Sequence, residues 1–301
     1  MNGWRFEEDS VTSADCLRQF DNLNVWKRGD QRAPHKPLLV LYALGQWQNG
    51  VTEIAFHDAC PIITDLLRDF GPERKTYHPE FPFWHLQSDG VWTINTDLEK
   101  RPGGSALKRE LWNQNAEGSL TPEVLLALAA DPWLAGEIAH RVLEAHFPQS
   151  LHSDILDRVG LNADLVVSRR RRRDPNFRDH VLTAYEFRCA VCGFDVRLGN
   201  ISVGLEAAHI KWHQASGPDR ADNGLALCSM HHKVFDLGVF TISEERHVVV
   251  SDRANGTEGL EALLLRFHRR PIKEAQRPEW QADAQYLDWH RREVFKGDPR
   301  T

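Results

Sequence analysis

Three of the five cysteines in this 301-residue chain lie in two short motifs that pair metal-binding side chains. Cys189 and Cys192 form a C-x-x-C motif, and Cys228 and His231 repeat the spacing as C-x-x-H. Two residues between ligands let a tight turn direct both side chains at one ion, and two such turns complete a tetrahedron. Three thiolates with one imidazole are a closed, soft ligand set, which is typical of structural Zn2+. The sequence therefore predicts a zinc site that organises the surrounding fold.

The same stretch contains harder donors, which suit a second, catalytic divalent ion. His232 directly follows His231, so we expect the two rings to face different ways, one toward the zinc and the other toward the second site. By spacing alone, the alternative is a zinc ribbon that binds DNA or protein without cutting it. The other harder donors are Glu206, His209, Asn223 and Asp236.

The order of these residues resembles the HNH (ββα-metal) nucleases, in the zinc-stapled form found in McrA-like, modification-dependent restriction endonucleases. The resemblance spans about residues 178–242 and is carried by E-A-A-H-I, N-G-L-x-L-C-x-x-H-H and F-D-x-G-x-F. It implies an HNH-type deoxyribonuclease, that is, a type IV restriction endonuclease and therefore a hydrolase.

The resemblance implies a role for three of these side chains. His209 is expected to be the general base that deprotonates a water for attack on a phosphodiester, because a neutral imidazole titrates in the right range. Asn223 is expected to hold the loop and to orient His209 by a side-chain hydrogen bond. His232 is expected to ligate Mg2+ or Mn2+, which stabilises the pentavalent phosphate and the leaving oxygen.

The carboxylate ligands of this catalytic ion are less tightly specified by the family pattern. Glu206 and Asp236 are the candidates. Ala208 departs from the pattern, since many relatives carry an Asp or His ligand at the position before the base. The departure leaves the first metal ligand open and does not affect the predicted base.

Two stretches in the N-terminal half combine prolines with aromatic residues. A-P-H-K-P-L-L-V-L predicts a buried helix with Pro37 in its first turn. In F-P-F-W-H-L-Q-S-D-G-V-W, the S-D-G sequence between apolar residues 83–86 and 91–94 predicts a β-hairpin. Together they resemble the DNA sulfur-binding domains found upstream of HNH domains in phosphorothioate-dependent restriction enzymes, over about residues 10–150.

Such a domain would read the sulfur that replaces one non-bridging oxygen of a DNA phosphate. An apolar hollow accepts sulfur, yet leaves the hydrogen bonds of an oxygen unmet. The resemblance places Phe81, Pro82 and His85 at this hollow, although the family usually has Tyr before the proline and often a smaller residue at His85. The alternative is that Phe81 and Trp84 only pack in the core. The nearest cations, expected to hold the flanking phosphates, are Arg32, His35, Lys36, Arg74 and Lys75.

Two other segments are expected to contact DNA. Ser105 lies in the basic turn R-P-G-G-S, which can approach the DNA backbone or be an ordinary loop. Residues 169–173 are five consecutive arginines. A charge run is usually a solvated face, but arginine matches phosphate geometry, so we favour DNA contact. Because the net charge is -6, any DNA contact must come from such local patches.

Length and composition limit the number of domains and the class of protein that we expect. The chain is long enough for two domains. No apolar run approaches the ~20 residues needed to span a bilayer, and the N-terminus lacks the apolar core of a signal peptide. The cysteines outside the motifs, Cys16 and Cys60, fit a reducing compartment. We expect a cytoplasmic protein with no membrane partner.

The sequence thus predicts an α+β protein with a mainly helical N-terminal domain that reads modified DNA and includes a β-hairpin (residues 1–150). A linker (151–168) and a zinc-stapled ββα-metal HNH domain (169–301) follow. We expect it to recognise phosphorothioate-modified double-stranded DNA and to cut nearby, with Zn2+ as structural ion and Mg2+ or Mn2+ as catalytic ion. Because one HNH site cuts one strand, double-strand cleavage predicts a homodimer. The alternatives are an HNH nuclease that reads methylated cytosine and a non-cleaving zinc-ribbon protein.

Overall fold

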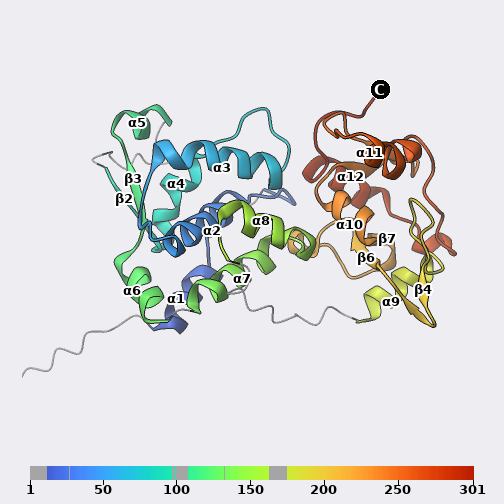
Figure 1. Cartoon of the computed structure of the whole chain (residues 1–301), viewed down its shortest axis with the longest axis horizontal. Helices are drawn as coiled ribbons and strands as arrows, with labels where there is room; N and C mark the ends of the chain where they lie inside the picture. Colours follow the sequence, from blue (N-terminus) through green and yellow to red (C-terminus); the bar gives the residue numbers. More distant parts are fainter. Residues whose placement is uncertain (1–11, 27, 97, 99–107, 132, 163–174) are drawn as a thin grey trace, which may run out of the picture.

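The computed structural model describes residues 12–301 except 27, 97, 99–107, 132 and 163–174. Helices and small antiparallel sheets form two units, each with its own hydrophobic core (Figure 1). We call residues 12–161 the N-terminal unit and residues 175–301 the C-terminal unit. The mixture of helix and sheet confirms the predicted α+β class. None of the helices in the described part of the chain has the length and apolar character that crossing a bilayer requires.

The N-terminal unit is built around one buried helix. Helix α2 is apolar on nearly all sides from Leu38 to Leu44, so it must be covered by other helices, and α3, α4, α7 and α8 pack against it. Gly45 allows the closest of these approaches, since a Cβ there would lie 2.0 Å from the carbonyl oxygen of Val159. The helices are α1 (Ser13–Asp21), α2 (His35–Gln48), α3 (Phe56–Phe70), α4 (Glu80–His85), α5 (Lys108–Asn113), α6 (Pro122–Ala130), α7 (Leu134–His146) and α8 (His152–Val159), with short 3-10 turns η1 (Leu86–Asp89) and η2 (Gln149–Leu151).

The hairpin predicted over residues 83–94 is wrong. Residues 80–89, which include the Ser and Asp of S-D-G, form α4 and η1. Strand β2 (Trp92–Asn95) pairs instead with β3 (Glu117–Leu120), which also pairs with β1 (Glu53–Ala55). Tertiary packing explains the outcome, because the indole of Trp92 donates a 3.0 Å hydrogen bond to the carbonyl of Phe83. The two rings also meet edge to face at 5.4 Å.

The C-terminal unit contains an antiparallel pair, β6 (Leu205–His209) and β7 (Gly224–Cys228), in contact with α9 (Pro175–Ala184) and α10 (Ser229–Asp236). This is the ββα arrangement that the sequence predicted. A second antiparallel pair begins at Phe240, and a helix lies close to the C-terminus. The remaining elements are β4 (Arg197–Leu198), β5 (Ile201–Ser202), η4 (His213–Ala215), η5 (Ala221–Asn223), β8 (Phe240–Ile242), β9 (Val248–Val250), α11 (Glu258–Leu263), η6 (Leu265–Phe267), η7 (Pro278–Trp280) and α12 (Ala284–Glu293).

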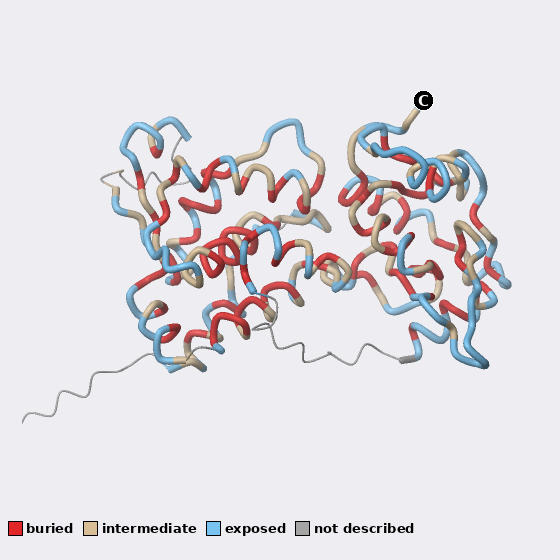
Figure 2. The backbone as a smooth tube through the Cα atoms, in the orientation of Figure 1, coloured by how far each residue is buried: buried red, intermediate tan, exposed pale blue. Residues whose placement is uncertain are grey.

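The two units are in direct contact. Figure 2 shows buried residues, in red, inside each unit, and η2 of the N-terminal unit contacts α10 of the C-terminal unit. Trp212 and Trp289 of the C-terminal unit are buried in the core of the N-terminal unit. Helix α8 lies within the segment that was expected to be a linker; it packs on α2 and therefore belongs to the N-terminal core.

Candidate functional site

The first cluster of the site is the set of four side chains identified from their spacing. Their ligand atoms all lie within 4.8 Å of one another, so they can hold one metal ion. The Sγ atoms of Cys192 and Cys228 are 4.0 Å apart, and Nδ1 of His231 lies 3.6 Å from Sγ of Cys189 and 3.2 Å from that of Cys228. Hydrogen bonds from Cys192 and Cys228 hold the pKa of Cys189 well below its ordinary value, which favours the ligating thiolate.

The ring of His231 is fixed in the form that suits a metal ligand. Its Nε2 lies 2.8 Å from the carbonyl oxygen of Leu263. A carbonyl oxygen only accepts, so Nε2 carries the proton and Nδ1 presents its lone pair to the cysteines. The donor set therefore fits a soft, tetrahedral ion such as Zn2+.

The imidazole of His209 stands at the end of β6, opposite Gly224. Its Nε2 lies 2.7 Å from Oδ1 of Asp219. The ring stacks on Phe177 of α9, with centroids 3.9 Å apart and planes 13° apart. Gly224 permits this packing, since a Cβ there would lie 2.3 Å from Val181. The ring is thus held on one face by an aromatic side chain and at one nitrogen by a carboxylate.

Asn223 closes the loop that brings Asp219 to the imidazole. The side-chain oxygen of Asn223 accepts a hydrogen bond from the Lys211 backbone N–H at 2.9 Å, and its amide donates to the carbonyls of Lys211 and Pro218, both at 3.0 Å. These contacts tie both ends of the loop. The carboxylate that contacts the His209 ring comes from Asp219, which sequence reasoning missed. The sequence signal for Asp219 was weak, because it consisted only of an Asp that follows Gly-Pro in a surface loop.

His232 faces away from the cysteine cluster, as the sequence predicted for one of the two neighbouring histidines. Its Nδ1 lies 2.6 Å from Oε2 of Glu206 and its Nε2 lies 3.1 Å from Oδ2 of Asp236. Burial lowers the pKa of His232, but the charges and hydrogen bonds of Asp236 and Glu206 outweigh it and raise the pKa to about 9. The two carboxylates therefore favour the positively charged form of the His232 ring.

The two carboxylates beside His232 differ in surroundings. The side chain of Glu206 is 47% exposed, and its Oε1 accepts a 2.9 Å hydrogen bond from Ser229. Asp236 is buried, and its Oδ1 accepts a 3.1 Å hydrogen bond from the indole of Trp212. Metal-ligating histidines commonly bond their second ring nitrogen to a carboxylate. A nitrogen of His232 with a neighbouring carboxylate oxygen therefore fits a divalent ion, and the side of Glu206 is the one open to solvent.

The predicted sulfur-pocket residues lie together on α4 and the start of α2. Residue Phe81 is 37% exposed. Its ring stacks on His78, with centroids 4.6 Å apart, and His85 meets it edge on at 6.2 Å. Pro82 is buried. Burial, assisted by the charges of His78 and Arg74, lowers the pKa of His35 to about 4, so its imidazole is neutral near pH 7.

The cations that were predicted to bind phosphate differ in their exposure and in their partners. Arg74 and Lys75 are exposed. Lys36 forms a 2.5 Å ion pair with Asp89 and is 11% exposed. The guanidinium of Arg32 donates to the carbonyls of Phe70 and Glu293 and lies over the ring of Trp212, at the contact between the units. Ser105 and the arginine run at residues 169–173 lie outside the described residues.

Comparison with known proteins finds two family models on this chain. The model described as ScoMcrA-like, DNA sulfur-binding domain matches residues 13–164. The model described as HNH endonuclease matches residues 189–243. The first match covers half of the chain, and the second contains the cysteine cluster, His209 and His232.

Three solved structures are similar to about half of this chain. The sulfur-binding domain of ScoMcrA with phosphorothioated DNA has 20% identity and a TM-score of 0.43, over 50% of this chain and 98% of that chain. The same domain of SprMcrA with phosphorothioated DNA has 23% identity and a TM-score of 0.43, over 51% and 96%. The type IV phosphorothioation-dependent restriction endonuclease ScoMcrA has 19% identity and a TM-score of 0.40, over 50% and 28%. No curated protein matches this chain.

Proposed function

Because the chain belongs to the ScoMcrA-like DNA sulfur-binding domain family and carries an HNH endonuclease domain, we propose that it is a modification-dependent endonuclease. The N-terminal unit binds phosphorothioated double-stranded DNA, and the C-terminal unit hydrolyses phosphodiester bonds nearby. The observation that carries the proposal is the carboxylate-backed imidazole of His209 in the same ββα element as the His232 donor set. A zinc ribbon with a purely structural role requires neither the His209–Asp219 pair nor the donors around His232.

In this proposal His209 is the general base. Asp219 accepts the hydrogen bond of Nε2–H, which fixes the tautomer in which Nδ1 takes the proton of the attacking water. Asp219 also stabilises the imidazolium that forms, as the carboxylate of a catalytic triad does. Phe177 holds the ring against rotation. Asn223 acts on His209 through the loop that it closes.

We propose Zn2+ at the four-ligand cluster and Mg2+ or Mn2+ at His232. Glu206 is the preferred second ligand, because an ion that meets a DNA phosphate needs a ligand on the exposed side. A divalent ion bound there supplies charge for the phosphorane and the leaving oxygen. Asp236 would then hold the second nitrogen of His232. The competing assignment, Asp236 as ligand, predicts that Asp236→Asn loses Mn2+ binding while Glu206→Gln keeps it.

Recognition of sulfur is assigned to Phe81, Pro82 and His85 of α4, of which Phe81 and His85 are exposed and Pro82 is buried between them in the sequence. A sulfur atom accepts hydrogen bonds poorly, so it loses few hydrogen bonds when it moves from water onto aromatic and proline faces. A phosphate oxygen in the same place would lose its hydrogen bonds to water, and no protein donor would replace them. Arg74 and Lys75 are exposed in the loop before α4 and are the cations proposed to hold the flanking phosphates. His35 would contact DNA as a neutral imidazole.

A cleavage assay tests the proposal. The protein is incubated with phosphorothioated, cytosine-methylated and unmodified duplexes of one sequence, with and without Mn2+, across a salt series that separates electrostatic from specific affinity. We expect cleavage of the phosphorothioated duplex alone, and only with the ion. Cleavage of only the methylated duplex would mean that the N-terminal unit reads a base. Binding without any cleavage would reduce the protein to a zinc-ribbon DNA-binding protein. Mass measurement during cleavage tests whether double-strand breaks require a homodimer.

A further inference from the structure

Helix α10, which carries His232, is attached to the N-terminal unit by polar contacts. Ser150, in η2, donates a hydrogen bond from Oγ to Oδ2 of Asp236. The same oxygen lies 3.1 Å from Nε2 of His232. The next residue of the helix, Lys233, pairs with Asp154 and donates to the carbonyl of Ser150. Two residues of α10 about one turn apart, Lys233 and Asp236, are therefore connected to η2 and α8.

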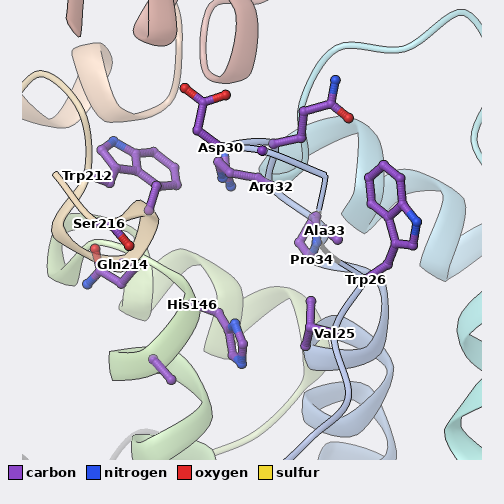
Figure 3. Close-up of a pocket in the computed structure, with 14 residues that line it drawn as sticks. Val25, Trp26, Asp30, Arg32, Ala33, Pro34, His146, Trp212, Gln214 and Ser216 are labelled. Atoms are coloured by element: carbon purple, nitrogen blue, oxygen red, sulfur yellow. The ribbon is translucent and has the colours of Figure 1, made fainter.

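The loop that follows β6 is held by the same region of the N-terminal unit. The indole of Trp212 donates to Oδ1 of Asp236 at 3.1 Å, and the guanidinium of Arg32 lies 3.8 Å from its ring centroid. The amide of Gln214 donates to the carbonyl of Phe147 at 2.9 Å, at the end of α7. Figure 3 shows Trp212, Gln214 and Arg32 among the residues that line a cavity of about 260 Å3.

The hydrogen bonds of Asp236 matter because its side chain is buried. Asp236 and Trp212 are almost inaccessible to solvent, so the carboxylate depends on protein donors. Those described above are the hydroxyl of Ser150, the indole of Trp212 and the ring of His232. Loss of one donor from a buried carboxylate costs more than loss of an exposed hydrogen bond, because water does not replace it. The carboxylate would then shift, and the ring of His232 with it.

We propose that Ser150 is a positioning residue of the nuclease, although it belongs to the unit that binds DNA. Through Asp236 it fixes the orientation of His232, while Gln214 fixes the loop between His209 and Asp219. The inference rests on the proposed function, since it concerns the same site. Its consequence is that turnover depends on how the two units are docked. A change at Ser150 therefore alters turnover and ion binding without altering DNA affinity.

The test compares full-length Ser150→Ala and Ser150→Thr with Ser153→Ala, which removes an exposed hydroxyl from the neighbouring turn of α8. Four quantities are measured: kcat and KM on the phosphorothioated duplex, DNA affinity by fluorescence anisotropy, Mn2+ affinity by calorimetry, and melting temperature. We expect Ser150→Ala to lower kcat and Mn2+ affinity about tenfold, with KM and DNA affinity unchanged. Ser150→Thr keeps the hydroxyl and restores both, and Ser153→Ala matches the wild type.

Wild-type kcat and Mn2+ affinity in Ser150→Ala would overturn the inference. A loss that Ser150→Thr shares would overturn it too, because the hydroxyl would then not be the cause. If the alanine variant melts below the assay temperature, Ser150→Cys, nearly isosteric and a weaker donor, replaces it with the same expectation. If the wild type leaves the phosphorothioated duplex uncut, the proposed function fails, and the Mn2+ affinities still decide the inference.

Discussion

Replacing Asp219 by asparagine removes the charge beside His209 and keeps the shape of the side chain. The bond between them is 2.7 Å long, and hydrogen bonds to charged groups contribute about 1.5–3 kcal/mol. Since about 1.4 kcal/mol is a factor of ten in rate, the full range corresponds to a loss of about 10- to 150-fold in kcat. The side chain of Asp219 is 32% exposed, so solvent screens part of the charge and we expect the lower end, about 10- to 30-fold.

Single-turnover cleavage of a phosphorothioated duplex measures this effect without product release. Asp179→Asn is the matched control, because Asp179 is an exposed carboxylate on α9, the helix that carries Phe177. DNA affinity is measured in parallel, and it should be the same in both variants and the wild type. A rate for Asp219→Asn equal to that of the control would refute the reasoning, since Asp219 would then be a surface residue that happens to lie near the ring.

Three further predictions address the zinc cluster, the sulfur pocket and pH. Cys192→Ser should lose bound zinc by mass spectrometry and unfold the C-terminal unit, because a structural zinc site contributes folding free energy; a variant that keeps its zinc would contradict the cluster. Phe81→Asp should abolish the preference for sulfur over oxygen in binding while leaving zinc content intact; an unchanged preference would remove Phe81 from the pocket. The pKa of His35 is lowered to about 4 in the folded protein. The unfolded chain therefore binds the proton more tightly than the folded one. The contribution of His35 to stability is present above about pH 6.5 and is lost as pH falls toward 4. His35→Asn should therefore show a smaller drop in melting temperature between those pH values than the wild type, and an equal drop would show that the imidazole is not buried.

The cysteine cluster and its neighbours were predictable because their chemistry is local. Two residues between Cys189 and Cys192, and again between Cys228 and His231, determine that each pair can face one ion. His231 and His232 point to different partners, because successive residues of a helix lie about 100° apart. The apolar run in α2 likewise required that other helices cover it.

The parts that depend on distant contacts were not predictable. Asp219 reaches His209 only because Asn223 closes the intervening loop. The expected hairpin after Phe83 gave way to a helix because Trp92 and Phe83 bond to each other while β2 pairs with β3. Arg32 was expected at a DNA phosphate on the strength of its neighbours in sequence, and in the structure its guanidinium binds two backbone carbonyls between the units.

The central claim is that one imidazole on the ββα element activates water for attack on a DNA phosphate. The most direct measurement compares wild type and His209→Ala on a phosphorothioated duplex with Mn2+, following both binding and strand cleavage. The account predicts that the variant binds with wild-type affinity, keeps its zinc and leaves the DNA uncut. Cleavage by His209→Ala at a rate near that of the wild type would contradict it.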